Sequence, residues 1–508
     1  MDTDAKIRNL EDLADLLISV RQEGKKIVHC HGVFDLLHIG HIRHFRQAKS
    51  YGDVLVVTIT PDRFVDKGPG RPAFSQDLRA EAVASVNEVD YVSINAWPTA
   101  VETLRLLRPH FYAKGSEFKG PQSDYTGKID KELEVIEEIG AQVVFTEDIV
   151  FSSSNLINRF LSCRPDEVQE YLGLFRQRYS IEYVHDVLNR MGSLKALVIG
   201  DAILDEYQYC ETIGKSNKDP VLAMQFRSSD LFIGGALAVA NQVAGFAGEV
   251  KLVTLLGEQE SHEGFIRENL HSKVVPHFAV RPGAPTLVKK RFLDGYSFNK
   301  LLEIYIMGDS DLPEETDADL CRRMKEEVSK YDLVIAADYG YGAIGRRMVD
   351  TLCENAPYLA VNTQSGAGNR GFHTVSRYSR ADFVCLSEQD IRLESRTMGG
   401  ELRPIMENLA ERLTCPTMVV TQGQRGCSVR KGKGNFVACP AFAERVVDRV
   451  GVGEVFFSVT ALAAVLGAED ELIGFLGNVV GSLAVGIIGN QKAIEKKSVE
   501  KYVTSLLK

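Results

Sequence analysis

One short stretch decides the fold of the first part of this chain: Gly32-Val33-Phe34-Asp35-Leu36-Leu37-His38-Ile39-Gly40-His41. It follows an apolar run at 26–31 that predicts a buried parallel strand, and it precedes a predicted helix at 42–49. Because His38 and His41 are three residues apart at the helix start, they lie on one face, one turn from each other. A helix N-terminus offers free N–H groups to an anion. Two imidazoles beside a bound phosphate can donate hydrogen bonds to charge that develops on phosphorus.

Bulk properties limit the class of protein. The 508 residues are too many for one ordinary core, so at least two domains are expected. The net charge of -10 argues against a nucleic-acid partner, although local basic pockets for phosphate remain possible. Nine cysteines without metal-ligand spacing indicate buried thiols in a reducing compartment. The polar N-terminus lacks a signal peptide, and the apolar run 472–489 contains Asn478 and Ser482, so we expect a cytoplasmic protein without a membrane partner.

Strand-like and helix-like runs alternate from residue 26 to about residue 160. Further strands are predicted at 54–59, 91–94 and 141–145, and helices at 77–87, 100–107 and 129–139. This alternation is typical of an α/β fold with a doubly wound parallel sheet. In such a fold, the ligand binds at the carboxyl ends of the strands.

Three other strings suit that edge of the sheet. A Gly- and Pro-rich loop carries Lys67 and Arg71, whose charges would suit a triphosphate; a surface turn would use the same Gly and Pro but would not need the cations. Lys114 stands at the end of an apolar run. The run 152–154 opens a predicted helix, where serines most often act as N-caps but also bind phosphate.

Together and in this order, these strings resemble the HxGH nucleotidyltransferases. The likeness is to the adenylyltransferase part of the bifunctional heptose-phosphate kinase/adenylyltransferases, and it extends to cytidylyltransferases for glycerol phosphate and related acceptors. It implies that residues 1–160 join CTP or ATP to a sugar or polyol phosphate and release pyrophosphate, with His38 and His41 as catalytic residues. The family usually has Asn where this chain has His31, which leaves the choice of base and acceptor open. The resemblance implies that nucleotide is bound by Gly32, Phe34, Asp35, Lys67, Arg71, Lys114, Ser152, Ser153 and Ser154.

A second α/β domain is expected after a charged connector at 161–194. A new strand is predicted at 196–201, and the alternation continues to residue 508. The strings at 200–207, 234–236, 336–340, 420–426 and 447–454 resemble the pfkB, or ribokinase-type, sugar kinases, again with a heptose kinase as the nearest likeness. This resemblance implies a second doubly wound domain. It assigns substrate binding to Asp205, Gly234, Gly235 and Asn241, ATP and anion binding to Thr421, Gly423, Gly426, Gly451 and Gly453, and catalysis to Glu454.

Several positions depart from the kinase pattern. The usual catalytic Asp is Glu454, the Asn after the diglycine is absent near Ala238, and the usual Lys is Tyr341. The metal-binding Asn-x-x-Glu element is replaced around Glu388. A carboxylate one methylene longer can misplace the base by about 1 Å, which can cost about a hundredfold in rate.

Two functions therefore stay open. One is a bifunctional kinase and nucleotidyltransferase that act on one metabolite line for nucleotide-activated sugars and glycans. The other is a nucleotidyltransferase whose pseudokinase domain serves as a ligand sensor or dimerisation module. The resemblance also implies Mg²⁺ as cofactor, with protein ligands that are unknown, a homodimer, and a domain order reversed relative to the heptose enzyme.

Overall fold

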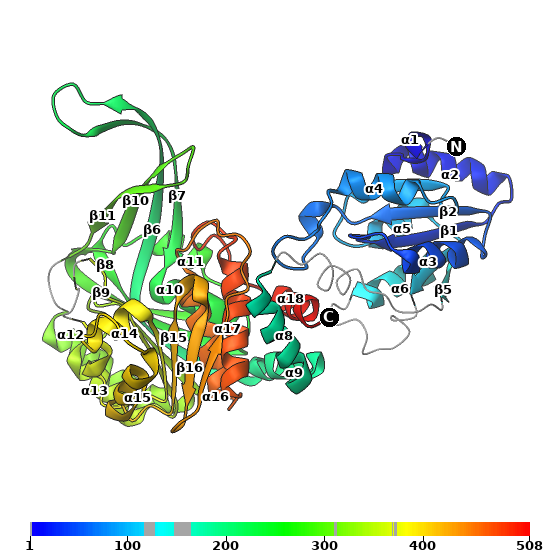
Figure 1. The fold of residues 1–508 in the computed structure, drawn as a ribbon. Coiled ribbons are helices and arrows are strands. Elements are labelled where there is room, and N and C mark those ends of the chain that lie inside the picture. The colour runs from blue at the N-terminus through cyan, green and yellow to red at the C-terminus, as the bar shows by residue number, and fades with distance from the viewer. Residues whose placement is uncertain (1–2, 116–127, 147–163, 309–311, 368, 370–372) are drawn as a thin grey trace. The chain divides into compact units, whose positions relative to one another are not determined.

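The computed structural model describes residues 3–115, 128–146, 164–308, 312–367, 369 and 373–508. The chain forms two compact units (Figure 1), one of Met1–Cys163 with Thr504–Lys508 and one of Arg164–Val503. Both are α/β units built around a mainly parallel sheet, which confirms the predicted fold class.

The first unit has a sheet with the strand order β3-β2-β1-β4-β5, in which all neighbours are parallel. The order reverses between β1 and β4, so a crevice is expected at their carboxyl ends. The predicted strands at 54–59 and 91–94 have the observed bounds, whereas the last strand lies one residue later than predicted. The strands are β1 (Ile27–Gly32), β2 (Val54–Ile59), β3 (Tyr91–Ile94), β4 (Phe111–Gly115) and β5 (Gln142–Thr146).

Alternate residues of the central strands face opposite helix layers. Val28 and Cys30 of β1 pack in the cluster that contains Phe45 of α3 and Ala80 of α4. Ile27 packs in the other cluster, with α2. The helices that precede β1 were not predicted. The helices are α1 (Thr3–Lys6), α2 (Leu10–Gln22), α3 (Ile39–Lys49), α4 (Gln76–Ala84), α5 (Val101–Leu107) and α6 (Lys128–Glu138), with a 3₁₀ turn η1 (Asp62–Phe64).

The second unit has one large sheet with the order β11-β10-β6-β12-β13-β14-β15-β16-β17, in which β7 and β8 also pair with β6, and β9 pairs with β8. In the central part, β9, β8, β6, β12, β13, β14 and β15 are each parallel to their neighbours, and β16 and β17 complete this part in antiparallel fashion. The strands are β6 (Lys195–Lys215), β7 (Leu222–Gly234), β8 (Glu249–Gln259), β9 (Val274–Pro285), β10 (Val288–Asp294), β11 (Lys300–Ile306), β12 (Leu333–Asp338), β13 (Leu359–Thr363), β14 (Phe383–Ser387), β15 (Thr417–Thr421), β16 (Cys427–Lys431) and β17 (Phe436–Cys439).

Strand β6 takes part in two regions of this large sheet. Residues 195–201 pair with β8 and residues 196–200 with β12, whereas residues from 203 onward pair with β7 and from 204 with β10. We call the sheet formed by β7, β6, β10 and β11 the lid sheet; it extends beyond the central sheet (Figure 1). The predicted strand at 196–201 is therefore only the first part of β6.

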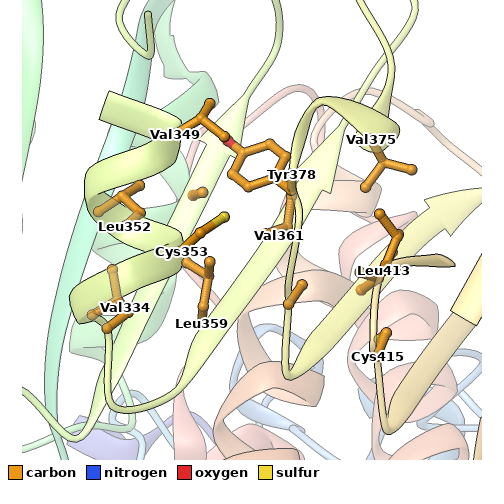
Figure 2. Packing of buried hydrophobic residues seen from close by; sticks show 14 of the residues in the cluster. Val334, Val349, Leu352, Cys353, Leu359, Val361, Val375, Tyr378, Leu413 and Cys415 are labelled. Atoms are coloured by element: carbon orange, nitrogen blue, oxygen red, sulfur yellow. The ribbon is translucent and has the colours of Figure 1, made fainter. Parts of the chain in front are cut away.

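Helices cover the central sheet of the second unit. Figure 2 shows part of one core cluster, in which Val349 and Leu352 of α13 gather with Val361 of β13 and Tyr378. Helix α8, in the stretch expected to be a connector, packs on this unit through Phe175, whose ring stacks 4.1 Å from that of Phe475. The helices are α8 (Asp166–Arg178), α9 (Ile181–Arg190), α10 (Gly235–Ala244), α11 (Glu263–Asn269), α12 (Glu314–Glu327), α13 (Arg346–Asn355), α14 (Glu388–Glu394), α15 (Leu402–Arg412), α16 (Val452–Val465), α17 (Asp470–Ala484) and α18 (Lys496–Leu507), with the 3₁₀ turns η3 (Met191–Ser193), η4 (Val328–Lys330), η5 (Val375–Arg377) and η6 (Gly423–Arg425).

The apolar run at 472–489 contains α17, whose Leu472 and Phe475 are fully buried in the second unit. Within the described part of the chain, no helix combines the length and the apolar character that a membrane span requires.

Candidate functional site

His38 and His41 begin helix α3, as predicted. His38 is the N-cap; its Nδ1 accepts the Gly40 N–H at 3.1 Å, and the His38 N–H is donated to His41 Nδ1 at 3.4 Å. The two rings stack with centroids 3.9 Å apart. Because each Nδ1 accepts a backbone hydrogen bond, the neutral rings carry their protons on Nε2. The cap therefore fixes the tautomer of both histidines.

These two rings are electrically neutral at physiological pH. Burial lowers the pKa of His38, and burial followed by the charges of His38, His44 and Lys67 lowers the pKa of His41 to about 3. His38 Nε2 is buried and has no hydrogen-bond partner among the described residues. A buried donor without a partner is costly unless a ligand supplies the acceptor. The helix start therefore offers a donor that a bound phosphate could satisfy.

The loop after β2 carries Lys67 and Arg71. Asp35, in the loop after β1, lies at the same site. Asp35 is buried, forms an ion pair with Arg71, and accepts the Ala73 N–H at 2.5 Å. The charge of Arg71 is thus balanced by Asp35, and this pair orders the loop. Burial, and then the charge of Arg71, lowers the pKa of Lys67 to about 8. Lys67 is consequently still mainly cationic at pH 7.

Arg79 of α4 is a site residue that the sequence did not indicate. Its side chain is buried and donates to the Val33 carbonyl oxygen, to the Thr60 carbonyl oxygen at 2.8 Å and to Asp62 at 2.7 Å. Arg79 therefore joins the loops that follow β1 and β2. Gly32 is required nearby, because a Cβ there would lie 2.9 Å from the ring of Phe34.

Lys114 lies at the end of β4, as predicted, but it is paired. Its Nζ lies 2.8 Å from Glu132 Oε2, and both side chains are largely buried. Glu132 had not been predicted because its partner is distant in sequence. The predicted phosphate ligands Ser152, Ser153 and Ser154 lie outside the described residues.

Asp205 of the second unit occupies the start of the lid sheet. It forms a buried ion pair with Arg291 of β10, which also donates to Glu303 Oε1 at 2.7 Å. Gly234 lies against it, because a Cβ on Gly234 would approach Asp205 Oδ2 to 2.4 Å; a Cβ on Gly235 would lie 2.4 Å from the Asp201 carbonyl oxygen. The diglycine therefore permits the backbone to approach Asp205 closely.

Asn241, which was predicted to bind the substrate, has both ends of its amide hydrogen-bonded within the protein. Both ends of its amide hold the turn after α11, since it donates to the Asn269 carbonyl oxygen at 2.8 Å and accepts the His271 N–H at 2.8 Å. It also lies about 9 Å along α10 from Gly235, at 1.5 Å per residue. In this structure Asn241 stabilises that turn, and its contact with a substrate stays a prediction.

Glu454 lies near Asp205, whose charge acts on it. Burial raises the pKa of Glu454; the nearby charge of Asp205 raises it further, whereas Lys289 and Arg291 oppose the shift. The two cations come from alternate positions of β10, so they lie on one side of the strand. The sequence carries Lys289 and Arg291 at this alternate spacing, but only the structure shows that Arg291 pairs with Asp205. Tyr341 also lies near Asp205, and Lys289 Nζ lies 4.9 Å from the Tyr341 ring centroid.

The glycine loop before α16 is held rigidly. Gly451 has φ +83°, and a Cβ there would lie 1.9 Å from Asn490 Oδ1. Asp448 accepts hydrogen bonds from Tyr207 Oη at 2.6 Å and from the Gly489 N–H at 2.9 Å, and it pairs with Lys300. Gly453 is exposed in the first turn of α16. The backbone N–H groups of this helix start are therefore available to an anion.

The predicted ATP side lies at the end of β15. Thr421 ends the strand, Gly423 has φ +60°, and Gly426 has φ +88° with room for no side chain, since its Cβ would lie 2.0 Å from the Cys439 carbonyl oxygen. The structure thus places these glycines in one tight turn, η6 and the residue after it.

Carboxylates near the expected metal element are already engaged. Glu388 pairs with Arg392 at 2.8 Å and with Arg425, and Asp390 accepts from the Ser387 and Ser365 hydroxyls at 2.5 Å each. Among the residues that the structure describes, no group of His, Cys, Asp and Glu side chains is arranged to hold a metal ion. These residues do not fit a protein-held Mg²⁺ at this place.

A cavity of about 260 Å³ lies in the second unit, where β6, β8 and β9 contribute to its lining. Its lining includes Asp201 of β6, Leu255 of β8, Arg281 of β9 and Tyr341. Tyr341 therefore borders this cavity and also lies near Asp205. A small molecule of the size of a monosaccharide can be accommodated here.

Comparisons with known proteins agree with both units. The cytidylyltransferase-like family matches residues 29–160, and the pfkB family of carbohydrate kinases matches residues 193–497. The chain is 37% identical over 172 residues to the bifunctional protein HldE of Geobacter metallireducens, covering 33% of each chain. It is 38% identical over 138 residues to the bifunctional protein HldE of Aliarcobacter butzleri, covering 27% of this chain and 29% of that one.

The chain thus aligns with about a third of the length of these curated relatives. These matches do not support the prediction that the domain order is reversed relative to the heptose enzyme. A provisionally named ribokinase from Agrobacterium tumefaciens shares the fold, with a TM-score of 0.50 and 16% identity over 62% of this chain and 99% of that one. The pfkB match spans more than half of the sequence. The chain therefore belongs to the pfkB family of carbohydrate kinases, and a cytidylyltransferase-like domain precedes its kinase domain.

Proposed function

We propose that the chain is a bifunctional enzyme. Its first domain joins CTP or ATP to a sugar or polyol phosphate and releases pyrophosphate, and its second domain phosphorylates a metabolite of the same line. The product would be a nucleotide-activated sugar or polyol for glycan assembly in the cytoplasm. The observation that carries this proposal is the start of α3, where two neutral histidines have their protons on Nε2 and one of these nitrogens is buried without a partner among the described residues.

In the first reaction, an oxygen of the acceptor phosphate forms a bond to the α-phosphorus of the nucleotide. The bond from that phosphorus to the bridging oxygen breaks, and pyrophosphate leaves. His38 and His41 would donate Nε2–H hydrogen bonds to the charge that accumulates on the phosphoryl oxygens. Lys67 would neutralise the leaving pyrophosphate. Because both histidines are neutral, they act as hydrogen-bond donors and not as cations.

Mg²⁺ would enter with the nucleotide. The ion usually keeps several water ligands and binds through substrate phosphates with one or two carboxylates. Glu388 and Asp390 have partners already, which favours a metal that the triphosphate carries over one that the protein holds.

In the second domain, Glu454 would accept the proton of the attacking hydroxyl, while the N–H groups at Gly451 and Gly453 hold the transferring phosphoryl group. The alternative is a pseudokinase that binds ligand without transferring phosphate. Arg291 favours this alternative, because it occupies the carboxylate of Asp205 that a sugar hydroxyl would need. An active kinase requires the substrate to displace or share that contact.

The proposed partner is a second copy of the chain, bound through the lid sheet. Apolar side chains are exposed along this sheet, among them Ile213 of β6, Phe226 of β7, and Leu302 and Ile304 of β11. A patch of this kind on a soluble protein marks an association surface. We expect sedimentation of the wild type as a dimer and of Phe226→Asp as a monomer; a monomeric wild type would refute the homodimer.

The decisive experiment measures pyrophosphate release. The full chain is incubated with CTP or ATP, Mg²⁺ and a panel of sugar and polyol phosphates. Release that depends on both the nucleotide and one acceptor supports the first domain's assignment, and the same panel of unphosphorylated sugars, with ADP as readout, tests the second. Nucleotide hydrolysis without any acceptor dependence would reject the transferase.

A further inference from the structure

Glu132 of α6 is a buried carboxylate for which the proposed reaction has no use. Its side chain is 4% exposed. Its Oε2 accepts the Tyr112 hydroxyl at 2.9 Å and lies 2.8 Å from Lys114 Nζ, and its Oε1 accepts the Ala100 N–H at 3.4 Å. Both carboxylate oxygens are thus bonded, and contacts from α5 and β4 fix the orientation of the group.

The partner of this carboxylate stands at a functional position. Lys114 is in β4, which pairs with β1 where the strand order of the sheet reverses. Ligands of doubly wound sheets bind in the crevice at such a reversal. A lysine side chain is long and flexible, so its charge has no fixed place unless neighbours restrain it. Here the ammonium lies between Glu132 and the ring of Tyr112, 4.9 Å from the ring centroid.

The surroundings of the pair are neutral. Burial and the nearby carboxylate hold the pKa of Tyr112 well above its ordinary value, so its hydroxyl remains a donor to Glu132. His29 stacks on the Tyr112 ring at 5.5 Å, and burial lowers the pKa of His29 to about 3, so that ring is uncharged. Tyr112 and Lys114 therefore share Glu132 Oε2, and neither ring places a second positive charge beside the carboxylate.

We propose that Glu132 is a positioning residue for nucleotidyl transfer. It holds the Lys114 ammonium at the carboxyl end of β4, where that cation meets a phosphate of the bound substrates. Glu132 itself does not touch the substrates; it acts only through Lys114. The proposal rests on the proposed transferase function of the first domain.

A double-mutant cycle tests this inference. Glu132→Gln and Lys114→Met should each lower kcat/KM for nucleotidyl transfer at least tenfold. The double variant should match Lys114→Met within about twofold, because a residue that acts through Lys114 has no further effect once Lys114 is gone. If Glu132→Gln lowers kcat/KM by the same factor in both backgrounds, its role is merely structural and the inference is overturned.

The matched control is Glu138→Gln on the same helix. Glu138 forms an exposed ion pair with Arg105 at 2.9 Å, and its removal should leave kcat/KM at the wild-type value. Thermal melting of each variant monitors folding. If Glu132→Gln does not fold, Glu132→Asp replaces it in the cycle, because Asp keeps the negative charge but places it one methylene farther from Lys114. Wild-type kinetics for Glu132→Asp would overturn the inference.

The affinities of the same four proteins for CTP·Mg²⁺ and ATP·Mg²⁺ are also measured by calorimetry, which requires no turnover. Non-additive losses in affinity would support the inference even without a known acceptor. A wild type that releases pyrophosphate but gives an additive cycle refutes only the role of Glu132. A wild type that neither binds nucleotide nor releases pyrophosphate refutes both the transferase and the inference that rests on it.

Discussion

Mild acid should selectively weaken the first domain, because three of its histidines are neutral rings in the folded state. Burial lowers the pKa of His29 and of His41 to about 3 and that of His44 to about 4, against 6.5 for an ordinary histidine. Below pH 6.5 these histidines bind protons in the unfolded chain but not in the folded domain. The free energy of unfolding therefore rises with pH in this range and falls as pH drops below 6.5.

The magnitude follows from the linkage relation. At pH 5.5 each histidine costs about 1.4 kcal/mol relative to pH 7.5, and the three together cost about 4 kcal/mol. Typical domains are stable by about 5–15 kcal/mol, so this loss is large. Carboxylates with ordinary pKa values remain ionised at pH 5.5, which keeps their contribution small.

The chain contains one tryptophan, Trp97, and it packs against the core cluster around α2 in the first unit. Urea titrations of the full chain followed by its fluorescence at pH 7.5 and 5.5 thus report on this domain. His29→Gln removes one titrating ring, so the difference between the two pH values should shrink by about 1.4 kcal/mol. A wild type whose stability differs by less than about 1 kcal/mol between these pH values would show that the rings are protonated in the folded domain.

Other consequences concern the two sites. His38→Ala should lower kcat for pyrophosphate release by roughly a hundredfold or more while leaving nucleotide KM nearly unchanged, and near-normal turnover would contradict its role as a donor. Lys67→Ala should raise the KM for the nucleotide, since Arg71 is balanced by Asp35 and cannot replace its charge; unchanged kinetics would reduce the loop to an ordinary turn. Glu454→Gln should eliminate sugar-dependent ADP formation with ATP binding intact, and Glu454→Asp should retain or improve it. A wild type that binds ATP but transfers no phosphate to any sugar or polyol would favour the pseudokinase.

The sequence predicted the elements whose signal is local. The strand at 54–59 is a continuous apolar run that is buried on both faces, and its bounds agree with the structure. Helix α2 was missed although apolar residues at 10, 13, 14 and 17 and the N-cap Asn9 provided both periodicity and a start signal. The second half of β6 was missed because Glu206 and Gln208 interrupt its apolar pattern.

Site residues, too, could be predicted only where the signal is local in the sequence. His38 and His41 could be predicted because the helix start that orients them is encoded within a few residues. Glu132 and Arg291 could not, since each acquires its role from a partner on another element: Lys114 in β4 and Asp205 in β6. An ion pair between elements that are far apart in sequence leaves no periodic trace, so only the tertiary structure reveals which charge is matched and which is available.

Strand β6 is shared by the lid sheet and the central sheet, and this limits how the lid sheet can move. A lid that is attached by a loop can move without distorting the central sheet. Here the backbone of β6 forms part of both the lid sheet and the central sheet, and its pairing partners change near Ala202. Any tilt of the lid sheet must therefore be a bend or twist of β6 between Asp201 and Asp205. Beyond Ala202 the strand runs on to Lys215, roughly 40 Å at about 3.3 Å per residue. A rotation of about 10° in this segment would therefore move the far end of the β6–β7 hairpin by roughly 7 Å.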